Sequence, residues 1–102
     1  MHQSWVYIMT NAHHNVLYVG VTSDIEQRVL QHKKHIHQSA FTAKYRCHKL
    51  IWFEEFDDIE VAIAQEKRIK RWRRPWKDVL IRKLNPELKD LSDGWYDPME
   101  LE

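Results

Sequence analysis

The alternation of apolar and polar residues near the start of the chain predicts a β-hairpin. Residues 4 to 10 alternate and are rich in aromatic and β-branched side chains, which is typical of a strand. Residues 11 to 15 form a polar turn, and the strand pattern returns over residues 16 to 21, with Gly20 expected to end this second strand. If the turn is centred on residues 12 and 13, Tyr7 lies directly across from Tyr18. Directly opposed residues project from one face of a sheet, whereas a slip of one residue would separate them.

Helical periodicity appears in three later segments. Ser23 and Glu26 match a capping box and predict a first helix from about residue 24 to residue 35, with Ile25 and Val29 facing inward. Asp57 and Glu60 predict a second helix over residues 59 to 73 in the same way. Its expected buried arc contains Ile59, Ala62, Ile63, Ile69 and Trp72.

A third helix and a third strand complete the expected elements. Pro75 precedes a helix over residues 76 to 84, which the Asn85-Pro86 pair stops. The inward residues of this helix are expected to be Val79, Leu80 and Leu84. Residues 45 to 56 predict a long strand. Its two faces are expected to carry Leu50, Trp52 and Phe56 on one side, and Ile51 and Phe53 on the other.

The resulting order β-β-α-β-α-α predicts an α+β domain with a small three-stranded antiparallel sheet flanked by helices. With 102 residues and 43% hydrophobic content, the chain has the size and composition of one folded domain. We expect this domain to span residues 1 to 92, followed by an acidic tail over residues 93 to 102.

The composition excludes several classes of protein. Cys47 is the single cysteine, so neither an intrachain disulfide nor a cysteine-rich metal site is possible. No apolar run approaches the 18 residues of a membrane span, and the N-terminal residues do not resemble a signal peptide. We therefore expect a cytoplasmic protein in a reducing setting.

Positive charge is concentrated in one segment, although the net charge is only +1. Between residues 67 and 74 the basic residues are Lys67, Arg68, Lys70, Arg71, Arg73 and Arg74. Such a run suits a polyanionic partner, and a solvated helix face explains it equally well. Trp72 lies within this run and Trp76 just beyond it. Their rings either stack on bases or pack into the core, and for Trp72 we favour packing into the core.

Glu66 interrupts the apolar arc of the second expected helix. A carboxylate in such a position is costly unless a cation neutralises it. Two interpretations stay open, namely a buried ion pair with a nearby Arg or Lys, and a Mg²⁺ site completed by waters and substrate phosphate oxygens.

Further candidates for chemistry lie on the hairpin and the first helix. Arg28 and His32 are four residues apart and share one helix face. A guanidinium grips phosphate oxygens, and an imidazole moves protons near neutral pH. Each of these residues, like Tyr7 and Tyr18, taken alone is more often an ordinary surface or core side chain. Tyr45 is a further candidate for the same cluster.

Taken together, these residues resemble the GIY-YIG nuclease family. The first motif reads Val6-Tyr7-Ile8 and the second reads Tyr18-Val19-Gly20. Residues 22 to 28 and His32 look like the family's helix, and residues 42 to 45, 54 to 56 and 64 to 72 look like the small stand-alone, single-domain subgroup of this family. The similarity covers about residues 4 to 92, which is nearly the whole chain.

The resemblance implies hydrolysis of phosphodiester bonds that depends on a divalent metal ion, Mg²⁺ or Mn²⁺. Tyr7 and Tyr18 would orient and activate water, and Arg28 would stabilise the developing phosphate charge. His32 would assist proton transfer, and Glu66 would hold the metal ion. A late asparagine often belongs to the family site, which makes Asn85 a secondary candidate.

The first hypothesis is therefore a Mg²⁺-dependent endonuclease that acts on structured or duplex DNA, in repair or recombination. Larger relatives carry a DNA-targeting domain, so here a protein partner would supply the targeting. The alternative is a nucleic-acid-binding module with the same fold and no catalysis, in which the basic run carries the affinity. A third hypothesis is a protein-interaction domain that uses the acidic residues 90 to 102.

Overall fold

Three antiparallel strands form the centre of the molecule. The computed structural model describes residues 3–34 and 45–102. The strands are β1 (Ser4–Thr10), β2 (Leu17–Thr22) and β3 (Lys49–Phe56), in the spatial order β2-β1-β3. The helices are α1 (Ile25–Lys34), α3 (Ile59–Arg71) and α4 (Arg74–Leu84). This order of elements confirms the predicted α+β fold.

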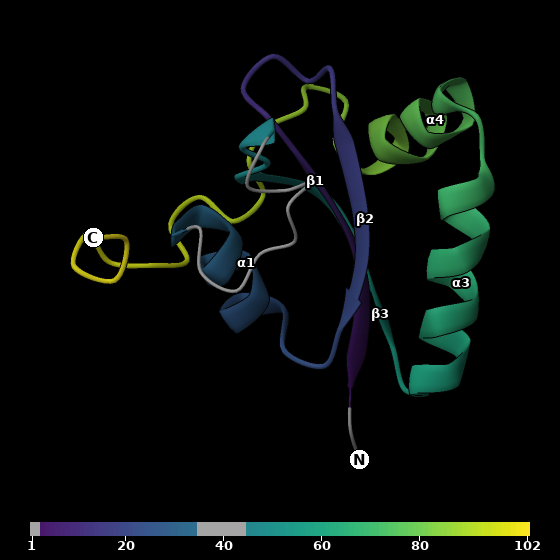
Figure 1. The fold of residues 1–102 in the computed structure, drawn as a ribbon, viewed down its shortest axis with the longest axis horizontal. Coiled ribbons are helices and arrows are strands. Elements are labelled where there is room, and N and C mark those ends of the chain that lie inside the picture. Colours follow the sequence, from purple (N-terminus) through teal and green to yellow (C-terminus); the bar gives the residue numbers. More distant parts are fainter. Residues whose placement is uncertain (1–2, 35–44) are drawn as a thin grey trace.

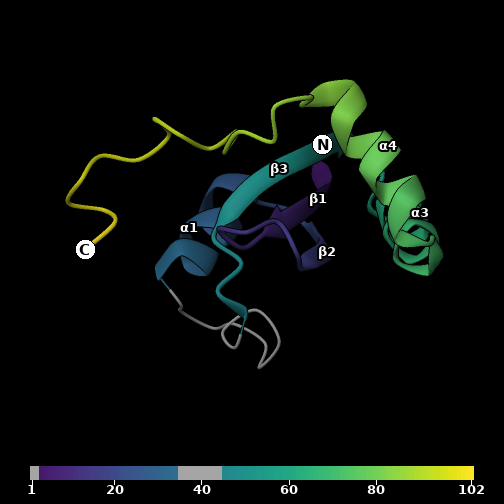
Figure 2. The same ribbon diagram turned by 90° about the horizontal axis from the view of Figure 1, so that it is seen from above.

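The helices cover both faces of the sheet, with α1 on one face and α3 and α4 on the other (Figures 1 and 2). Because β1 is the middle strand, its side chains are buried on both faces. Val6 and Ile8 pack into the core on the α3 side, whereas Tyr7 and Met9 pack into the core on the α1 side. A central strand covered on both faces therefore explains the nearly continuous burial of β1.

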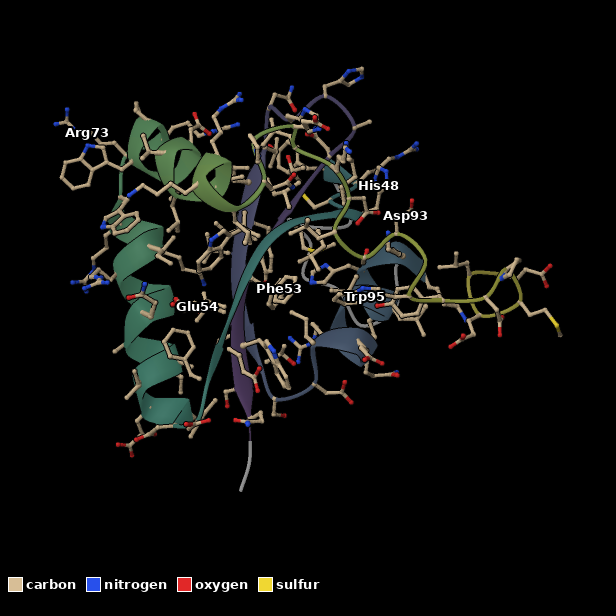
Figure 3. All side chains as sticks on the ribbon, turned by 180° about the vertical axis from the view of Figure 1, so that it is seen from behind. His48, Phe53, Glu54, Arg73, Asp93 and Trp95 are labelled. Atoms are coloured by element: carbon tan, nitrogen blue, oxygen red, sulfur yellow. The ribbon has the colours of Figure 1, made fainter. Side chains whose placement is uncertain are left out.

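A β-bulge changes the predicted faces of β3. The register shifts between Ile8 and Met9 of β1, so Ile51 is an extra residue on β3. As a result Ile51 and Trp52 both pack on the α3 side. The prediction that these two residues face opposite sides is therefore wrong. Figure 3 shows the normal alternation resuming beyond the bulge, with Phe53 on the α1 side and Glu54 on the α3 side.

Strand β3 also begins later than predicted. It starts at Lys49, not at residue 45, because Tyr45 is helical and Arg46 has the left-handed backbone conformation with φ 54°. Both features interrupt an extended chain. Cys47 consequently lies before the strand, where it is fully buried in the core on the α1 side.

Both helix caps lie one residue later than predicted. In α1 the Asp24 carboxylate, not the Ser23 hydroxyl, accepts a hydrogen bond from the backbone N–H of Gln27, at 3.1 Å. In α3 the cap is Asp58, which accepts from Glu60 N at 2.8 Å. At each site two adjacent residues have suitable side-chain oxygens, and the second of them is the one that caps the helix.

The α3–α4 corner also differs from the prediction. Helix α3 ends at Arg71, and α4 begins at Arg74 with Pro75 in its first turn. The buried anchor of α4 is Ile81, whereas Val79 and Leu84 are more than half exposed. In α3, Ile59 and Ile63 are likewise exposed. These helices bury a narrower stripe than their apolar positions suggest.

The chain beyond α4 returns to the α1 face of the sheet (Figure 1). Leu91 N donates to Leu50 O at 2.7 Å, and the Trp95 ring lies edge-on to the Phe53 ring with centroids 5.9 Å apart. Figure 3 shows Phe53 and Trp95 together on this side. Residues 91, 95 and 96 therefore extend the core on the α1 side. Among the described residues, no helix combines the length and the apolar character needed to cross a membrane.

The burial pattern of α3 predicts unequal effects of one substitution at two sites. Ile69→Ala removes a fully buried side chain and leaves a cavity, so we expect a loss of about 2–5 kcal/mol in the free energy of unfolding. The matched control is Ile63→Ala, which removes a side chain that is 37% exposed and should cost about 1 kcal/mol. Urea titrations of both variants measure this difference. Equal losses would contradict the assignment of the buried stripe.

Candidate active site

Three aromatic rings from three elements meet on the α1 face of the sheet. Tyr7 comes from β1, Tyr18 from β2 and His32 from α1. The ring centroids are 6.3 Å apart for the two tyrosines, 5.6 Å for Tyr7 and His32, and 5.3 Å for Tyr18 and His32. The Tyr7 hydroxyl and His32 Nε2 form a buried hydrogen bond of 3.0 Å. We call these three residues the ring cluster.

The two tyrosines share a face, as predicted, but they are not directly opposed. Tyr7 pairs with Gly20, and Tyr18 pairs with Met9. The hairpin is centred one residue later than expected, because His14 takes the left-handed conformation with φ 57° and the chain turns there. The register therefore shifts by two positions relative to the prediction, and a shift of two leaves a side chain on the same face.

Gly20 provides the space for the Tyr7 ring. Strand β2 continues to Thr22, so the prediction that Gly20 ends the strand is wrong. A Cβ atom at residue 20 would lie 2.5 Å from the Tyr7 hydroxyl oxygen and 2.6 Å from ring atom Cζ. The phenol therefore leans from β1 across the backbone of β2. A glycine inside a strand often marks such a close approach.

Burial keeps both hydrogen-bonded groups of the ring cluster neutral. Burial raises the pKa of Tyr7, the nearby Tyr18 raises it further, and the Arg28 guanidinium opposes the change. Burial and the positive charge of Arg28 lower the pKa of His32 to about 4. A neutral imidazole therefore faces a neutral phenol near pH 7. Arg28 is on an exposed part of α1, one turn before His32.

The chain after α4 fixes the position of α1. Lys33 Nζ lies 2.6 Å from the Asp90 carboxylate, and the Tyr96 hydroxyl donates to Glu26 O at 2.6 Å. Both ends of α1 are thus tied to the C-terminal segment.

Asp90 makes further contacts that strengthen this attachment. Its other oxygen accepts hydrogen bonds from Leu50 N and from the backbone and hydroxyl of Ser92. Burial alone would raise the pKa of Asp90, but the hydrogen bonds from Lys33 and Ser92 outweigh burial and hold this pKa below its usual value. Sequence reasoning missed these contacts, because no local pattern links residues so distant along the chain.

Glu66 lies on α3, on the opposite side of the sheet from the ring cluster. Its carboxylate is 3.3 Å from Lys70 Nζ, and its side chain is 13% exposed. The lysine is half exposed, so the ion pair is open to solvent and the carboxylate is not sealed. The structure thus brings together Tyr7, Tyr18 and His32, and it places Glu66 across the sheet from them.

The basic run occupies the exposed side of α3 and the corner before α4. All six of its cationic residues are exposed. Arg74 ties α4 to the hairpin loop by donating to His14 O at 2.6 Å and Asn15 O at 3.2 Å. Arg68 lies over the ring of Trp72, which is half-buried against the core, as favoured from the sequence. Figure 3 shows Arg73 at the outer junction of the two helices.

The secondary candidates lie outside the ring cluster. Tyr45 lines a pocket next to the hairpin loop, together with Asn11, His13 and His48. Asn85 is buried, and its amide nitrogen donates to Ile51 O and Lys89 O while its oxygen accepts from Lys89 N. These bonds hold the end of α4 against β3.

Two further features bear on metal binding and nucleophilic chemistry. Within residues 3–34 and 45–102, no three side chains of His, Cys, Asp or Glu are grouped as metal ligands. The predicted helix extended to residue 35, which lies outside the described ranges. Burial raises the pKa of the Cys47 thiol, which favours its protonated form.

Comparisons with known proteins identify similar chains. The model of the GIY-YIG catalytic domain matches residues 3–79. A UPF0213 protein from Syntrophus aciditrophicus is 33% identical over 87 residues, which cover 85% of this chain and 98% of that protein. A UPF0213 protein from Bacillus pumilus is 30% identical over 86 residues, covering 84% of this chain and 86% of that protein. No solved structure gives a significant match.

The depressed pKa of His32 predicts acid sensitivity of the fold. Its pKa falls from 6.5 to about 4 on folding, so between these values the unfolded chain binds a proton that the folded chain does not. The contribution of His32 to stability is therefore complete above pH 6.5. It should decline by up to about 3 kcal/mol as the pH falls to 4. Urea unfolding across this range should show a flatter profile for His32→Gln, whereas the exposed His13→Gln control should keep the wild-type slope.

The contact between Gly20 and Tyr7 predicts coupling between the two positions. Gly20→Ala should cost about 1–3 kcal/mol of stability, because the new methyl group overlaps the phenol ring. In a Tyr7→Leu background the same substitution should cost clearly less, since the hydroxyl and distal ring atoms are gone. A double-mutant cycle by urea unfolding measures this coupling. Additive effects would show that the ring does not rest on residue 20.

Proposed function

We propose that this chain, which belongs to the GIY-YIG catalytic domain family, hydrolyses phosphodiester bonds of DNA with the help of a divalent metal ion. Membership of this family implies nuclease-type activity. The observation that carries the proposal is the buried hydrogen bond between Tyr7 and His32, with Tyr18 beside it and Arg28 one helical turn away. These groups supply the proton acceptor and the phosphate ligand that hydrolysis needs.

In this proposal the ring cluster positions and activates the attacking water. The phenol donates its proton to His32 Nε2, which is neutral and therefore able to accept it. The oxygen lone pairs of Tyr7 then accept a hydrogen bond from water. As the water attacks phosphorus, its proton passes to Tyr7 and the phenol proton passes to His32. Tyr18 helps to orient the same water.

Arg28 binds the phosphate that is attacked. Its guanidinium lies close enough to affect the pKa values of both Tyr7 and His32. A planar fork of N–H donors matches two phosphate oxygens and stabilises the charge that develops on them. This position on α1 places the cation beside the proton-transfer pair.

Glu66 is the proposed ligand for the metal ion, either Mg²⁺ or Mn²⁺. One carboxylate, completed by waters and substrate phosphate oxygens, fits a Mg²⁺ site, and the Glu66 side chain keeps 13% of its surface exposed beside a half-exposed Lys70. When bound, the ion polarises the phosphate and stabilises the leaving oxygen.

In this proposal the substrate phosphate binds at the edge of β2, between Glu66 and the ring cluster. This strand is an edge strand, and α3 packs against it from the face opposite to the ring cluster. The Tyr7 ring leans over Gly20 of the same strand. A phosphate at this edge would lie between the ring cluster on one face of the sheet and Glu66, the residue that would hold the ion, on the other.

The basic run supplies affinity for DNA. Lys67, Arg71 and Arg73 are exposed and available for phosphate contacts, which are independent of base sequence. We propose structured or duplex DNA as substrate, a role in repair or recombination, and a protein partner that provides targeting.

One observation favours a second function, a nucleic-acid-binding module without catalysis. Glu66 is already paired with Lys70 and lies across the sheet from the ring cluster. In that case the basic run carries all of the affinity and Glu66 is a structural ion pair.

A cleavage assay distinguishes these two functions. Structured DNA is incubated with wild type, Glu66→Gln and Arg28→Ala in Mg²⁺ and in Mn²⁺. We expect each variant to cleave at least about 100-fold more slowly, because each loses a group that stabilises the transition state. Glu66→Gln should also weaken the dependence of the rate on metal concentration.

The matched control is Glu87→Gln, which removes an exposed carboxylate that pairs with the exposed Lys89. It should cleave at the wild-type rate. Equal cleavage rates for wild type, Glu66→Gln and Arg28→Ala would contradict the assignment of these residues to the active site. Salt-dependent DNA binding by a wild type that cleaves nothing in either metal would establish the second function.

A further inference from the structure

An aromatic groove lies on the outer side of the α3–α4 corner. Trp76 is 63% exposed, and its ring is nearly perpendicular to that of Trp72, with centroids 6.2 Å apart. The groove is lined by Trp72, Trp76, Val79, Leu80 and Lys83. We call it the tryptophan groove. A second hollow, which includes Arg68, continues from it past Trp72 and Lys83.

The surroundings of the tryptophan groove carry strong positive charge. Residues 67 to 83 contain nine cationic side chains and a single acid, Asp78. Arg68 and Lys83 stand at the groove itself, and Arg73 lies at the junction of the two helices (Figure 3). Burial and the charge of Arg74 lower the pKa of Lys77, in keeping with this crowding of like charges.

We propose that the tryptophan groove binds an unpaired nucleotide of the DNA substrate. This inference rests on the proposed function and specifies its substrate class, namely DNA with a single-stranded branch or overhang. The base stacks on the exposed Trp76 ring, and the flanking phosphates lie against Arg73 and Lys83. Stacking on an aromatic side chain beside cations is how proteins hold single strands without reading their sequence.

One feature favours an unpaired base over a paired one, and a second favours a nucleic acid as the partner. The exposed ring of Trp76 needs the flat face of a base, and inside a duplex that face is covered by the neighbouring base pairs. The cations extend along both helices and beyond the groove, which suits a long polyanion.

The location of the tryptophan groove connects it to the proposed active site. Arg74 holds the start of α4 against the carbonyls of His14 and Asn15, in the loop that leads into β2. In Figure 1 this loop and α4 lie at the same end of the sheet. A strand held by Trp76 can therefore follow the loop to the edge of β2, where hydrolysis is proposed.

Fluorescence anisotropy in EDTA tests this binding without cleavage. Labelled single-stranded DNA, blunt duplex and duplex with an overhang are titrated with wild type, Trp76→Ala and Trp76→Phe. We expect Trp76→Ala to bind single strands and overhangs about 10-fold more weakly, and the blunt duplex with unchanged affinity. Trp76→Phe should recover most of the lost affinity. Single-stranded RNA, titrated in the same way, should bind with an affinity similar to that of single-stranded DNA.

Two further variants sharpen the test. Met99→Ala removes another exposed apolar side chain, far from the basic face, and should bind all substrates like wild type. Lys83→Gln should reduce the slope of affinity against salt by about 1, because it removes one phosphate contact. Circular dichroism confirms that each variant is folded.

Two outcomes would overturn the inference. The first is that Trp76→Ala binds single strands and overhangs with an affinity within about twofold of that of wild type. The other is a dimer, seen by sedimentation, that both Trp76→Ala and deletion of residues 97–102 abolish, since the acidic tail of a second copy would then occupy the groove. Loss of cleavage together with intact Trp76-dependent binding would instead remove only the proposed hydrolysis.

Discussion

The contact between the Tyr7 ring and the backbone of Gly20 is the constraint on which the site depends. It brings the phenol from the central strand across the edge strand, where the hydroxyl reaches His32. Any side chain at residue 20 would occupy the volume of the ring. The same contact carries the hydroxyl out over β2, so one glycine sets both the hydrogen-bonding partner of the phenol and the edge of the sheet at which chemistry is proposed.

Burial then determines what the hydrogen-bonded pair can do. Tyr7 is fully buried and His32 is 4% exposed, which disfavours the charged form of each. The charge of the adjacent Arg28 acts to lower the pKa of both groups, since a positive charge favours phenolate and disfavours imidazolium. The guanidinium thus favours a neutral imidazole beside the phenol.

The sequence was sufficient to predict the order of elements and to place Tyr7 and Tyr18 on the same face of the sheet. Local patterns determine both, because strand alternation and capping residues act over a few positions. Their limits are visible at the hairpin, where the left-handed His14 moved the register by two, and at Ile51, where a bulge reversed the expected faces of β3. The position of Glu66 across the sheet was beyond local reasoning, since it depends on which face each helix covers. The role of Gly20 could not be predicted either, because the strand register must be known before Tyr7 can be identified as the residue beside it.

The attachment of α1 to Asp90 and Tyr96 has a consequence for how the family motifs are interpreted. Both anchoring residues lie after residue 79, where the similarity to the catalytic domain model ends. The motifs specify which candidate site residues are present, while contacts from outside the motifs hold α1, the helix that carries both Arg28 and His32. Chains with identical motifs can thus differ in the rigidity of their reactive groups, according to the residues that come after the last shared helix.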